Sequence, residues 1–235
     1  MGLKSRWRLG SRLALAIKAQ INDVCAQRSR PRPSAIHSSC RSVSGRGSMP
    51  MDPAMRHAVP VRRLLGIKTL FNIIGPLTNP AGSRRQVLGV ARPEMADMIA
   101  QALHKLDTKH ALVVHGGGLC DMTVTGESRV VEVRPEGIRE WRITPEEVGL
   151  RRSELKDLLV DSPAQSAERI HGILRGECGA ARDIAVLNAG AAILVSGKAA
   201  SLAEGVKAAQ EAVDSGAARA KLEAFVRVSR AGGGR

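Results

Sequence analysis

Residues 62–85 read RRLLGIKTLFNIIGPLTNPAGSRR, an amphipathic helix followed by a stiff loop. The apolar residues between Leu64 and Ile74 recur at near-helical spacing. Gly75 and Pro76 then end the helix, because glycine suits the position after a helix end and proline cannot continue the hydrogen-bond ladder. A helix with an ordinary connection would show the same pattern, so the flanking sequence must decide the fold.

The sequence directly after this loop predicts a βαβ unit. Residues 86–91 and 110–115 are short apolar runs typical of buried strands. Between them, apolar residues at helical spacing predict a helix over residues 95–106, whose buried face consists of Met95, Met98, Ile99, Ala102, Leu103 and Leu106. Because the connections are short, we expect parallel strands with a right-handed crossover.

A hairpin and then helices are predicted for the rest of the chain. Residues 129–133 and 138–143 are expected to pair as the hairpin. Capping-box spacing predicts helix starts at Thr144, Ser162 and Ser201. Residues 183–195 are apolar on nearly every face, residues 202–213 on one face, and residues 217–228 form the last predicted helix. The predicted fold class is α/β, with a central mixed sheet that contains a parallel βαβ unit and is surrounded by helices.

Length and composition limit the classes of protein that fit. A chain of 235 residues allows one domain with a small appendage, and 43% hydrophobic residues suffice for a core although aromatics make up only 2%. No apolar run reaches the roughly 18 residues of a membrane span. The four cysteines lie far apart without a Cys-x-x-Cys pair, which argues against a zinc site or a disulfide framework and predicts a cytoplasmic location.

The positive charge is concentrated at the start of the chain. Of the net charge of +14, residues 1–49 contribute ten basic residues and one acid. We interpret residues 1–48 as a poorly ordered basic segment rich in Arg and Ser, or as the product of a start error or frameshift. Residues 49–230 form the predicted domain, and residues 231–235 a frayed tail. Nucleic-acid binding is disfavoured because the chain has almost no aromatic residues for stacking.

The run LGIKTLFNIIGPLTNPAGSRRQVLGV, residues 65–90, closely resembles the central signature of the anthranilate phosphoribosyltransferase family. The resemblance extends from about Met51 to about Val226. It implies the large α/β domain of this family, a Mg²⁺ cofactor and a role in tryptophan biosynthesis. The implied reaction transfers phosphoribose from phosphoribosyl pyrophosphate to anthranilate and gives N-(5-phosphoribosyl)anthranilate. The pyrimidine nucleoside phosphorylases share the fold by resemblance, but the signature run argues against them.

The resemblance also implies site residues. Arg62 would pair with the anthranilate carboxylate through two hydrogen bonds, although a solvated surface arginine would also fit the pattern. Gly75 and Pro76 would line the acceptor pocket. The family's Gly-Leu-Asp-Glu metal motif corresponds here to Gly-Leu followed by Cys120 and Asp121. Asp121 would be the surviving magnesium ligand, and Cys120 would weaken binding because magnesium prefers oxygen.

A glycine run precedes this motif and could serve anion binding through backbone N–H groups. His115 is followed by three glycines, which also resembles a lipase oxyanion motif. Esterase activity would need a G-x-S-x-G sequence, and the chain contains none. Esterase activity is therefore disfavoured for these glycines.

Several departures from the family limit the expected activity. The family's small helical domain and its Gly-Thr-Gly-Gly-Asp pyrophosphate loop have no counterpart in residues 1–37. We therefore expect a truncated copy with reduced or no activity. The alternative is a non-catalytic remnant that binds an aromatic acid or acts as a scaffold. A homodimer, which the family forms through its helical domain, is in doubt for the same reason.

Overall fold

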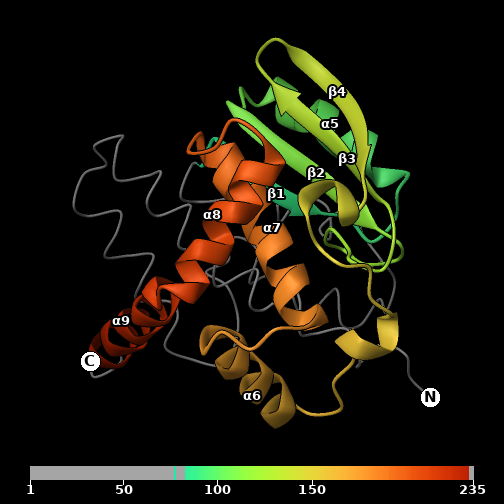
Figure 1. The fold of residues 1–235 in the computed structure, drawn as a ribbon. Coiled ribbons are helices and arrows are strands. Elements are labelled where there is room, and N and C mark those ends of the chain that lie inside the picture. The colour runs from blue at the N-terminus through green and yellow to red at the C-terminus, as the bar shows by residue number, and fades with distance from the viewer. Residues whose placement is uncertain (1–76, 78–82, 233–235) are drawn as a thin grey trace, which may run out of the picture. The chain divides into compact units, whose positions relative to one another are not determined.

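The computed structural model describes residue 77 and residues 83–232 (Figure 1). Arg84–Leu222 belong to one compact unit, and Glu223 onward belongs to a second. The first unit contains the sheet and the helices that cover it. The predicted segment 1–48 and the start of the predicted domain at residue 49 lie outside the described residues, so those limits stay predictions.

The unit is built on a four-stranded mixed sheet in the order β1-β2-β3-β4. The strands are β1 Arg85–Gly89, β2 His110–Gly116, β3 Ser128–Arg134 and β4 Gly137–Ile143. β1 and β2 run parallel, whereas β2–β3 and β3–β4 are antiparallel. This confirms the mixed sheet, the parallel βαβ unit and the hairpin.

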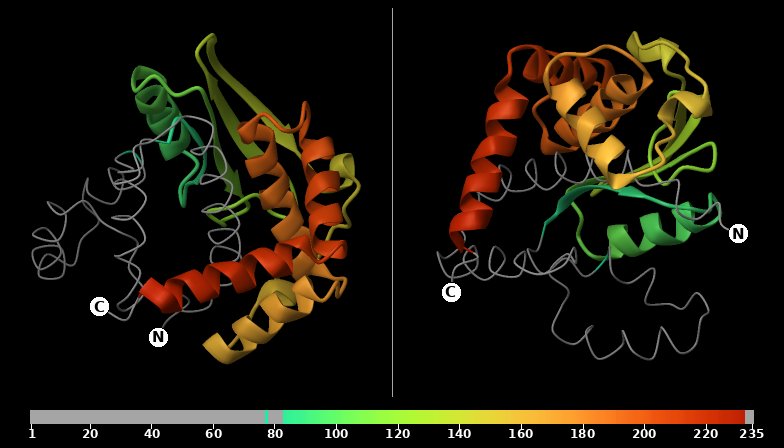
Figure 2. Two further views of the ribbon diagram at one scale, coloured as in Figure 1. Left: turned by 90° about the vertical axis from the view of Figure 1, so that its left-hand side faces the viewer. Right: turned by 90° about the horizontal axis from the view of Figure 1, so that it is seen from below.

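Helix α5, Met95–Lys105, forms the crossover and packs on one face of the sheet against β2, β3 and β4 (Figure 2). It buries Ala96, Ile99, Ala100 and Leu103. The predicted face is wrong in part, because Met98 is 58% exposed and Leu106 57%. The apolar stripe of this helix is wider than the strip that the sheet covers, so Ile99 and Leu103 are buried whereas Met98 and Leu106 lie outside that strip.

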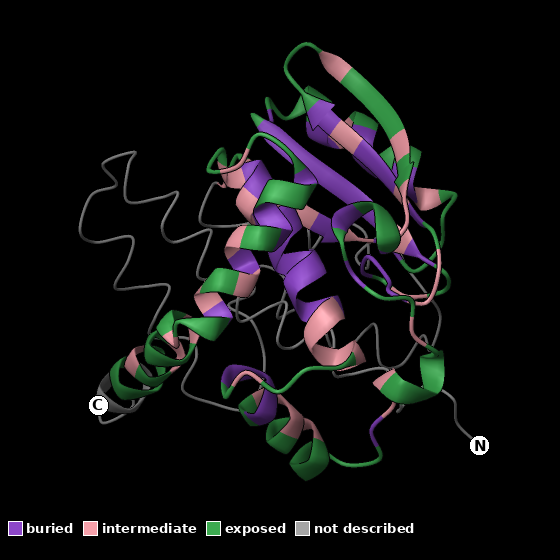
Figure 3. Ribbon diagram, viewed as in Figure 1, coloured by how far each residue is buried: buried purple, intermediate pink, exposed green. Residues whose placement is uncertain are grey.

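Helix α7, Ala180–Ser196, covers the other face of the sheet, and α8, Leu202–Asp214, packs against α7 (Figure 2). α7 is buried on almost every side, as predicted, because it lies between the sheet and α8 (Figure 3). The two helices touch backbone to backbone: a Cβ added to Gly205 would lie 2.4 Å from the Gly190 carbonyl oxygen. Only glycine at both positions allows this approach.

Shorter elements complete the described fold. They are the 3-10 helices η2, Glu146–Val148, and η3, Leu155–Leu158, and the α-helices α6, Pro163–Leu174, and α9, Ala217–Gly232. α9 therefore extends two residues into the segment predicted as a frayed tail. Within the described ranges, none of the helices combines the length and apolar character needed to cross a membrane.

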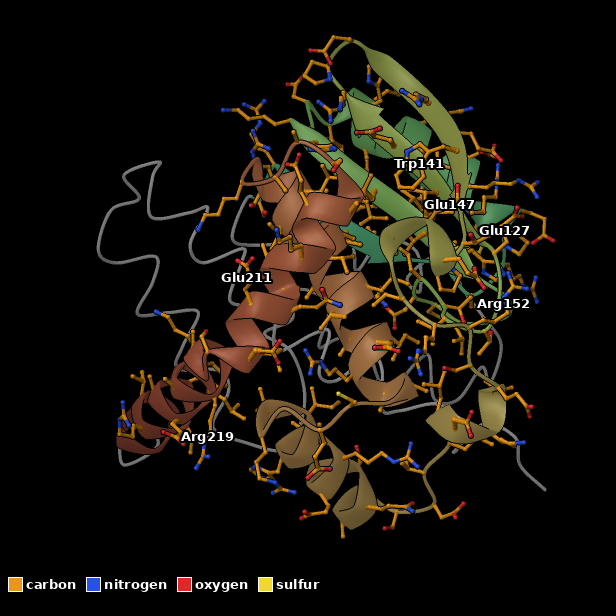
Figure 4. All side chains as sticks on the ribbon, in the orientation of Figure 1. Glu127, Trp141, Glu147, Arg152, Glu211 and Arg219 are labelled. Carbon is orange, nitrogen blue, oxygen red and sulfur yellow. The ribbon has the colours of Figure 1, made fainter. Side chains whose placement is uncertain are left out.

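Two of the three predicted caps begin α-helices. The Ser162 and Ser201 hydroxyls accept hydrogen bonds from the backbone N–H groups of Gln165 and Glu204, at 3.1 and 3.2 Å. The third, at Thr144, begins only a single 3-10 turn. Glu147, labelled in Figure 4, accepts from the Thr144 N–H and hydroxyl at 2.7 and 2.8 Å, but the left-handed conformation at the next glycine ends the turn.

Candidate functional site

The candidate site is the loop of residues 117–127, which follows β2 at the carboxyl edge of the parallel strands. β1 ends beside it, because β1 and β2 run in the same direction. The contact is very close: a Cβ added to Gly89 would lie 1.4 Å from the carbonyl oxygen of Cys120. A Cβ on Gly116 would lie 2.6 Å from the Asp121 carbonyl oxygen. Two glycines thus let the strand ends touch the loop backbone directly.

The glycine run forms a tight turn at the start of this loop. Gly116 and Leu119 exchange N–H···O hydrogen bonds of 3.3 and 2.9 Å, while Gly117 and Gly118 adopt positive φ angles of 53° and 90°. The Gly118 N–H also donates to Nε2 of His115 at 3.4 Å. The expected anion cradle of free N–H groups is therefore wrong, since the amides of Gly116 and Gly118, like that of Leu119, are already engaged.

His115 ties this turn back to β1. Its Nδ1 lies 2.9 Å from the carbonyl oxygen of Val90 and must donate, because a carbonyl can only accept. Nε2 is then the acceptor that receives the Gly118 N–H. These two bonds fix the neutral ring in a single tautomer, so His115 acts here as a bridge between two backbone segments.

Cys120 and Asp121 follow the turn and differ in exposure. Cys120 is exposed, whereas Asp121 is only 8% exposed. Within the described residues, no group of three His, Cys, Asp or Glu side chains could hold a metal. Magnesium is commonly held by one or two carboxylates together with water and substrate phosphates. Asp121 fits that role, whereas the thiol of Cys120 does not, because sulfur is a poor ligand for a hard cation.

The loop is held from behind by a buried side chain of α7. Asn188, 2% exposed, accepts from the Met122 N–H at 3.1 Å and donates to the Met122 carbonyl at 2.9 Å. Its second N–H donates to the Ile184 carbonyl at 2.9 Å. Sequence reasoning missed Asn188, although a lone amide inside an otherwise apolar helix was a visible signal.

The loop closes with side-chain bonds of its own. The Ser128 hydroxyl accepts from the Thr123 N–H at 2.9 Å, and the hydroxyl of Thr123 accepts from the Thr125 N–H at 3.0 Å. The Val124 carbonyl accepts from the Ser153 N–H at 2.9 Å. Every residue from Met122 to Thr125 is thus attached to another part of the loop or the unit.

A second polar cluster lies at the opposite end of the sheet. Nε2 of His110 is 2.8 Å from Oε1 of Glu132, which also accepts from Nε of Arg134 at 2.7 Å. Burial lowers the pKa of His110, and the Arg134 charge lowers it further. Burial alone would raise the pKa of Glu132, but hydrogen bonds from Arg134 and His110 outweigh it and lower that pKa. The pair is a neutral imidazole donating to a carboxylate.

The structure tests only part of the predicted site. Cys120 and Asp121 lie in the braced loop described above. Arg62, Gly75 and Pro76, predicted to bind the acceptor, lie outside the described residues, so their roles stay predictions.

Comparison with known proteins identifies relatives of this chain. A model described as "Glycosyl transferase family, a/b domain" matches residues 47–219. The anthranilate phosphoribosyltransferase of Nitrosospira multiformis is 48% identical over 181 residues, which cover 75% of this chain and 52% of that protein. The enzyme of the same name from Rubrobacter xylanophilus is 50% identical over 185 residues, 78% of this chain and 54% of that protein. The chain spans about half the length of these relatives.

Solved structures agree with the sequence matches. Anthranilate phosphoribosyltransferase from Thermus thermophilus superposes with a TM-score of 0.70 at 46% identity, covering 76% of this chain and 53% of that one. The Saccharomyces cerevisiae enzyme in complex with PRPP and Mg gives a TM-score of 0.69 at 26% identity, covering 75% and 52%. Both confirm the α/β fold.

Proposed function

Because this chain belongs to the glycosyl transferase family through its α/β domain, we propose that it carries the corresponding part of an anthranilate phosphoribosyltransferase. In the proposed reaction, the nitrogen of anthranilate attacks the anomeric carbon of phosphoribosyl pyrophosphate, and pyrophosphate leaves. The observation that carries the proposal is Asp121, largely buried on a braced loop at the carboxyl edge of two parallel strands. Ligands of open α/β sheets bind at this edge.

The reaction requires the protein to position the substrates and to neutralise charge, and it does not require a protein nucleophile. The displacement passes through a cationic sugar centre and releases a polyanion, so orientation and charge neutralisation supply most of the catalysis. Asp121 would hold magnesium, which neutralises charge on the departing pyrophosphate when bound. Arg62 would orient anthranilate by pairing with its carboxylate, and Gly75 and Pro76 would shape the pocket around the ring.

We expect Cys120 to weaken the part of the site that binds phosphoribosyl pyrophosphate, the donor of the phosphoribosyl group. It supplies sulfur where the resembled metal motif has a carboxylate, and removing part of an electrostatic clamp costs on the order of a hundred-fold in rate. Cys120→Asp should therefore raise activity and lower the magnesium concentration that gives half the maximal rate. Cys178→Asp makes the same chemical change at another exposed cysteine and should leave both quantities unchanged.

The test is consumption of anthranilate fluorescence by the full chain with phosphoribosyl pyrophosphate and magnesium. The expected order of rates is Cys120→Asp above wild type, and wild type above Asp121→Ala. Equal rates for wild type and Asp121→Ala would remove Asp121 from the donor site. The absence of turnover in every variant, including Cys120→Asp, would contradict the proposed activity for this chain.

A non-catalytic role in binding an aromatic acid is the second candidate. The observation that favours it is the set of possible metal ligands, because the described loop offers one carboxylate beside a thiol. Anthranilate binding without turnover, measured by its fluorescence, would support this role. Arg62→Ala should abolish that binding, whereas Arg63→Ala, the adjacent arginine, should not. The homodimer and the cytoplasmic location stay predictions, which light scattering and fractionation of cells would test.

A further inference from the structure

We propose that Asn188 is a positioning residue that fixes the place of the Asp121 carboxylate by clamping the next residue of the loop; this rests on the proposed donor role of Asp121. The clamp is a long-range contact, since 66 positions separate Asn188 from Met122. It joins α7, the most buried helix described, to the loop at the strand ends. Asp121 directly precedes the clamped residue, so its backbone cannot move independently of α7.

The hydrogen bonds of Asn188 fit only an amide of this length. Its oxygen accepts from the Met122 N–H, and its nitrogen donates to the Met122 and Ile184 carbonyls. A carboxylate would present no donor to either carbonyl, and an aliphatic side chain would satisfy none of the three groups. Met122 is itself fully buried, so water does not replace these bonds. One side chain therefore satisfies both backbone groups of Met122.

The clamp matters because the turn and β1 act on the N-terminal side of Asp121. The Gly116–Leu119 turn and the close approach of Gly89 fix the backbone up to Cys120. Beyond Asp121, the first hydrogen-bonded support along the chain is the pair of bonds from Asn188 to Met122. The backbone of Asp121 is thus held between a backbone contact on one side and the Asn188 amide on the other, and a fixed backbone limits the positions that its carboxylate can take.

A purely structural role for Asn188 would make different predictions. If Asn188 only satisfied buried backbone groups, its loss would lower stability without a specific effect on the donor. Leu194→Ala supplies the matched control, because Leu194 is a buried residue of the same helix whose apolar side chain can form no hydrogen bond with the loop. Comparing the two variants separates positioning from loss of stability in α7.

The experiment uses the full chain as wild type, Asn188→Ala, Leu194→Ala, Asp121→Ala and the double variant Asn188→Ala/Asp121→Ala. Binding of phosphoribosyl pyrophosphate with magnesium is measured by titration calorimetry. We expect Asn188→Ala to weaken binding at least tenfold and Leu194→Ala less than twofold. In the double variant, Asn188→Ala should add less than twofold to the loss caused by Asp121→Ala, because it acts through Asp121.

Two further readouts do not depend on the donor. Hydrogen exchange at the Met122 amide should accelerate at least tenfold in Asn188→Ala and not in Leu194→Ala. Alkylation of the exposed Cys120 thiol by iodoacetamide, followed by peptide mass spectrometry, should change at least threefold. Cys178 is the internal reference, since it is also exposed but lies just before α7 and not in the loop. If Asn188→Ala does not fold, Asn188→Ser takes its place with the same expected directions.

The outcomes separate this inference from the proposed function. Wild-type chain that binds no donor contradicts the proposed function, and the clamp is then judged by exchange at Met122 and alkylation of Cys120 alone. Unchanged exchange and alkylation in Asn188→Ala overturn the clamp whatever the donor does. Faster exchange with unchanged donor binding, or losses that multiply in the double variant, also overturn it, because Asn188 would not act through Asp121.

Discussion

Gly89→Ala should displace the site loop. The glycine is the last residue of β1, and the added Cβ would lie 1.4 Å from the Cys120 carbonyl oxygen and 2.5 Å from its carbon. Real Cβ atoms stay at least 3.0 Å from such atoms, so the oxygen would have to retreat by about 1.6 Å. The atoms in conflict belong to the backbone of the strand and of the loop, so a side-chain rotation cannot relieve the overlap. The glycine turn and Asn188 also hold the loop on either side of the contact.

The expected cost follows from this overlap. Overpacking a core by extra carbon atoms costs about 1–3 kcal/mol, occasionally more. Because backbone and not a flexible side chain must move, we place Gly89→Ala at about 3 kcal/mol, the upper end of that range. For a unit of this size, that loss lowers Tm by about 6–12 °C. The displaced atoms belong to Cys120, so donor binding should fall together with stability.

The assay is thermal unfolding followed by circular dichroism, with donor affinity measured below the transition. Gly126→Ala is the matched control: it lies in the same loop, and a Cβ there would meet nothing within 4 Å. This control should change the free energy of unfolding by less than about 1 kcal/mol in either direction. A Tm for Gly89→Ala within about 2 °C of the control, the effect of less than about 1 kcal/mol, would refute the close contact.

Three smaller effects are expected elsewhere in the unit. Asp107 has φ 53° just after α5, so Asp107→Gly should stabilise by about 0.5 kcal/mol while Asp107→Ala should not, as measured by urea unfolding. Burial lowers the pKa of His110 below its ordinary value of 6.5. Below pH 6.5 the unfolded chain therefore binds more protons than the folded chain. Because of this difference, the free energy of unfolding should fall as the pH decreases from 6.5. His110→Gln should flatten this slope between about pH 7.5 and 5.5, and an unchanged slope would assign it to other groups. Ser201→Ala removes the cap of α8 and should cost about 1 kcal/mol in the same urea assay, with the exposed Ser215→Ala near zero as control.

Much of the described fold could be predicted because local signals and tertiary packing agree. The parallel pair β1–β2 follows from two short apolar runs around one helix, and α7 follows from a run that is apolar on all sides. The buried face of α5 could not be chosen, because its apolar stripe is wider than its contact with the sheet. Met98 and Leu106 lie at helical spacing but outside the strip that the strands cover.

The candidate site could be located but not constructed from the sequence. Resemblance to a metal motif pointed to Asp121, yet the supports of its loop are contacts between distant positions. A lone Asn188 inside an apolar helix signalled a buried polar contact, but nothing local could name Met122 as the partner. The glycine run was misinterpreted for a similar reason: the amides of Gly116 and Gly118 find acceptors in Leu119 and His115, which spacing alone does not show.

The described supports of the donor loop come from residues after Ser83, whereas the predicted acceptor residues Arg62, Gly75 and Pro76 lie in the part of the chain that the structure does not describe. Among the described residues, the loop is held by its own turn, by β1 and by Asn188. Substitutions in the two groups should therefore act independently: Arg62→Ala should weaken anthranilate binding without changing donor affinity, and Cys120→Asp should strengthen donor binding without changing anthranilate affinity. If instead each change altered both affinities, the sites for the two substrates would be coupled through a shared element.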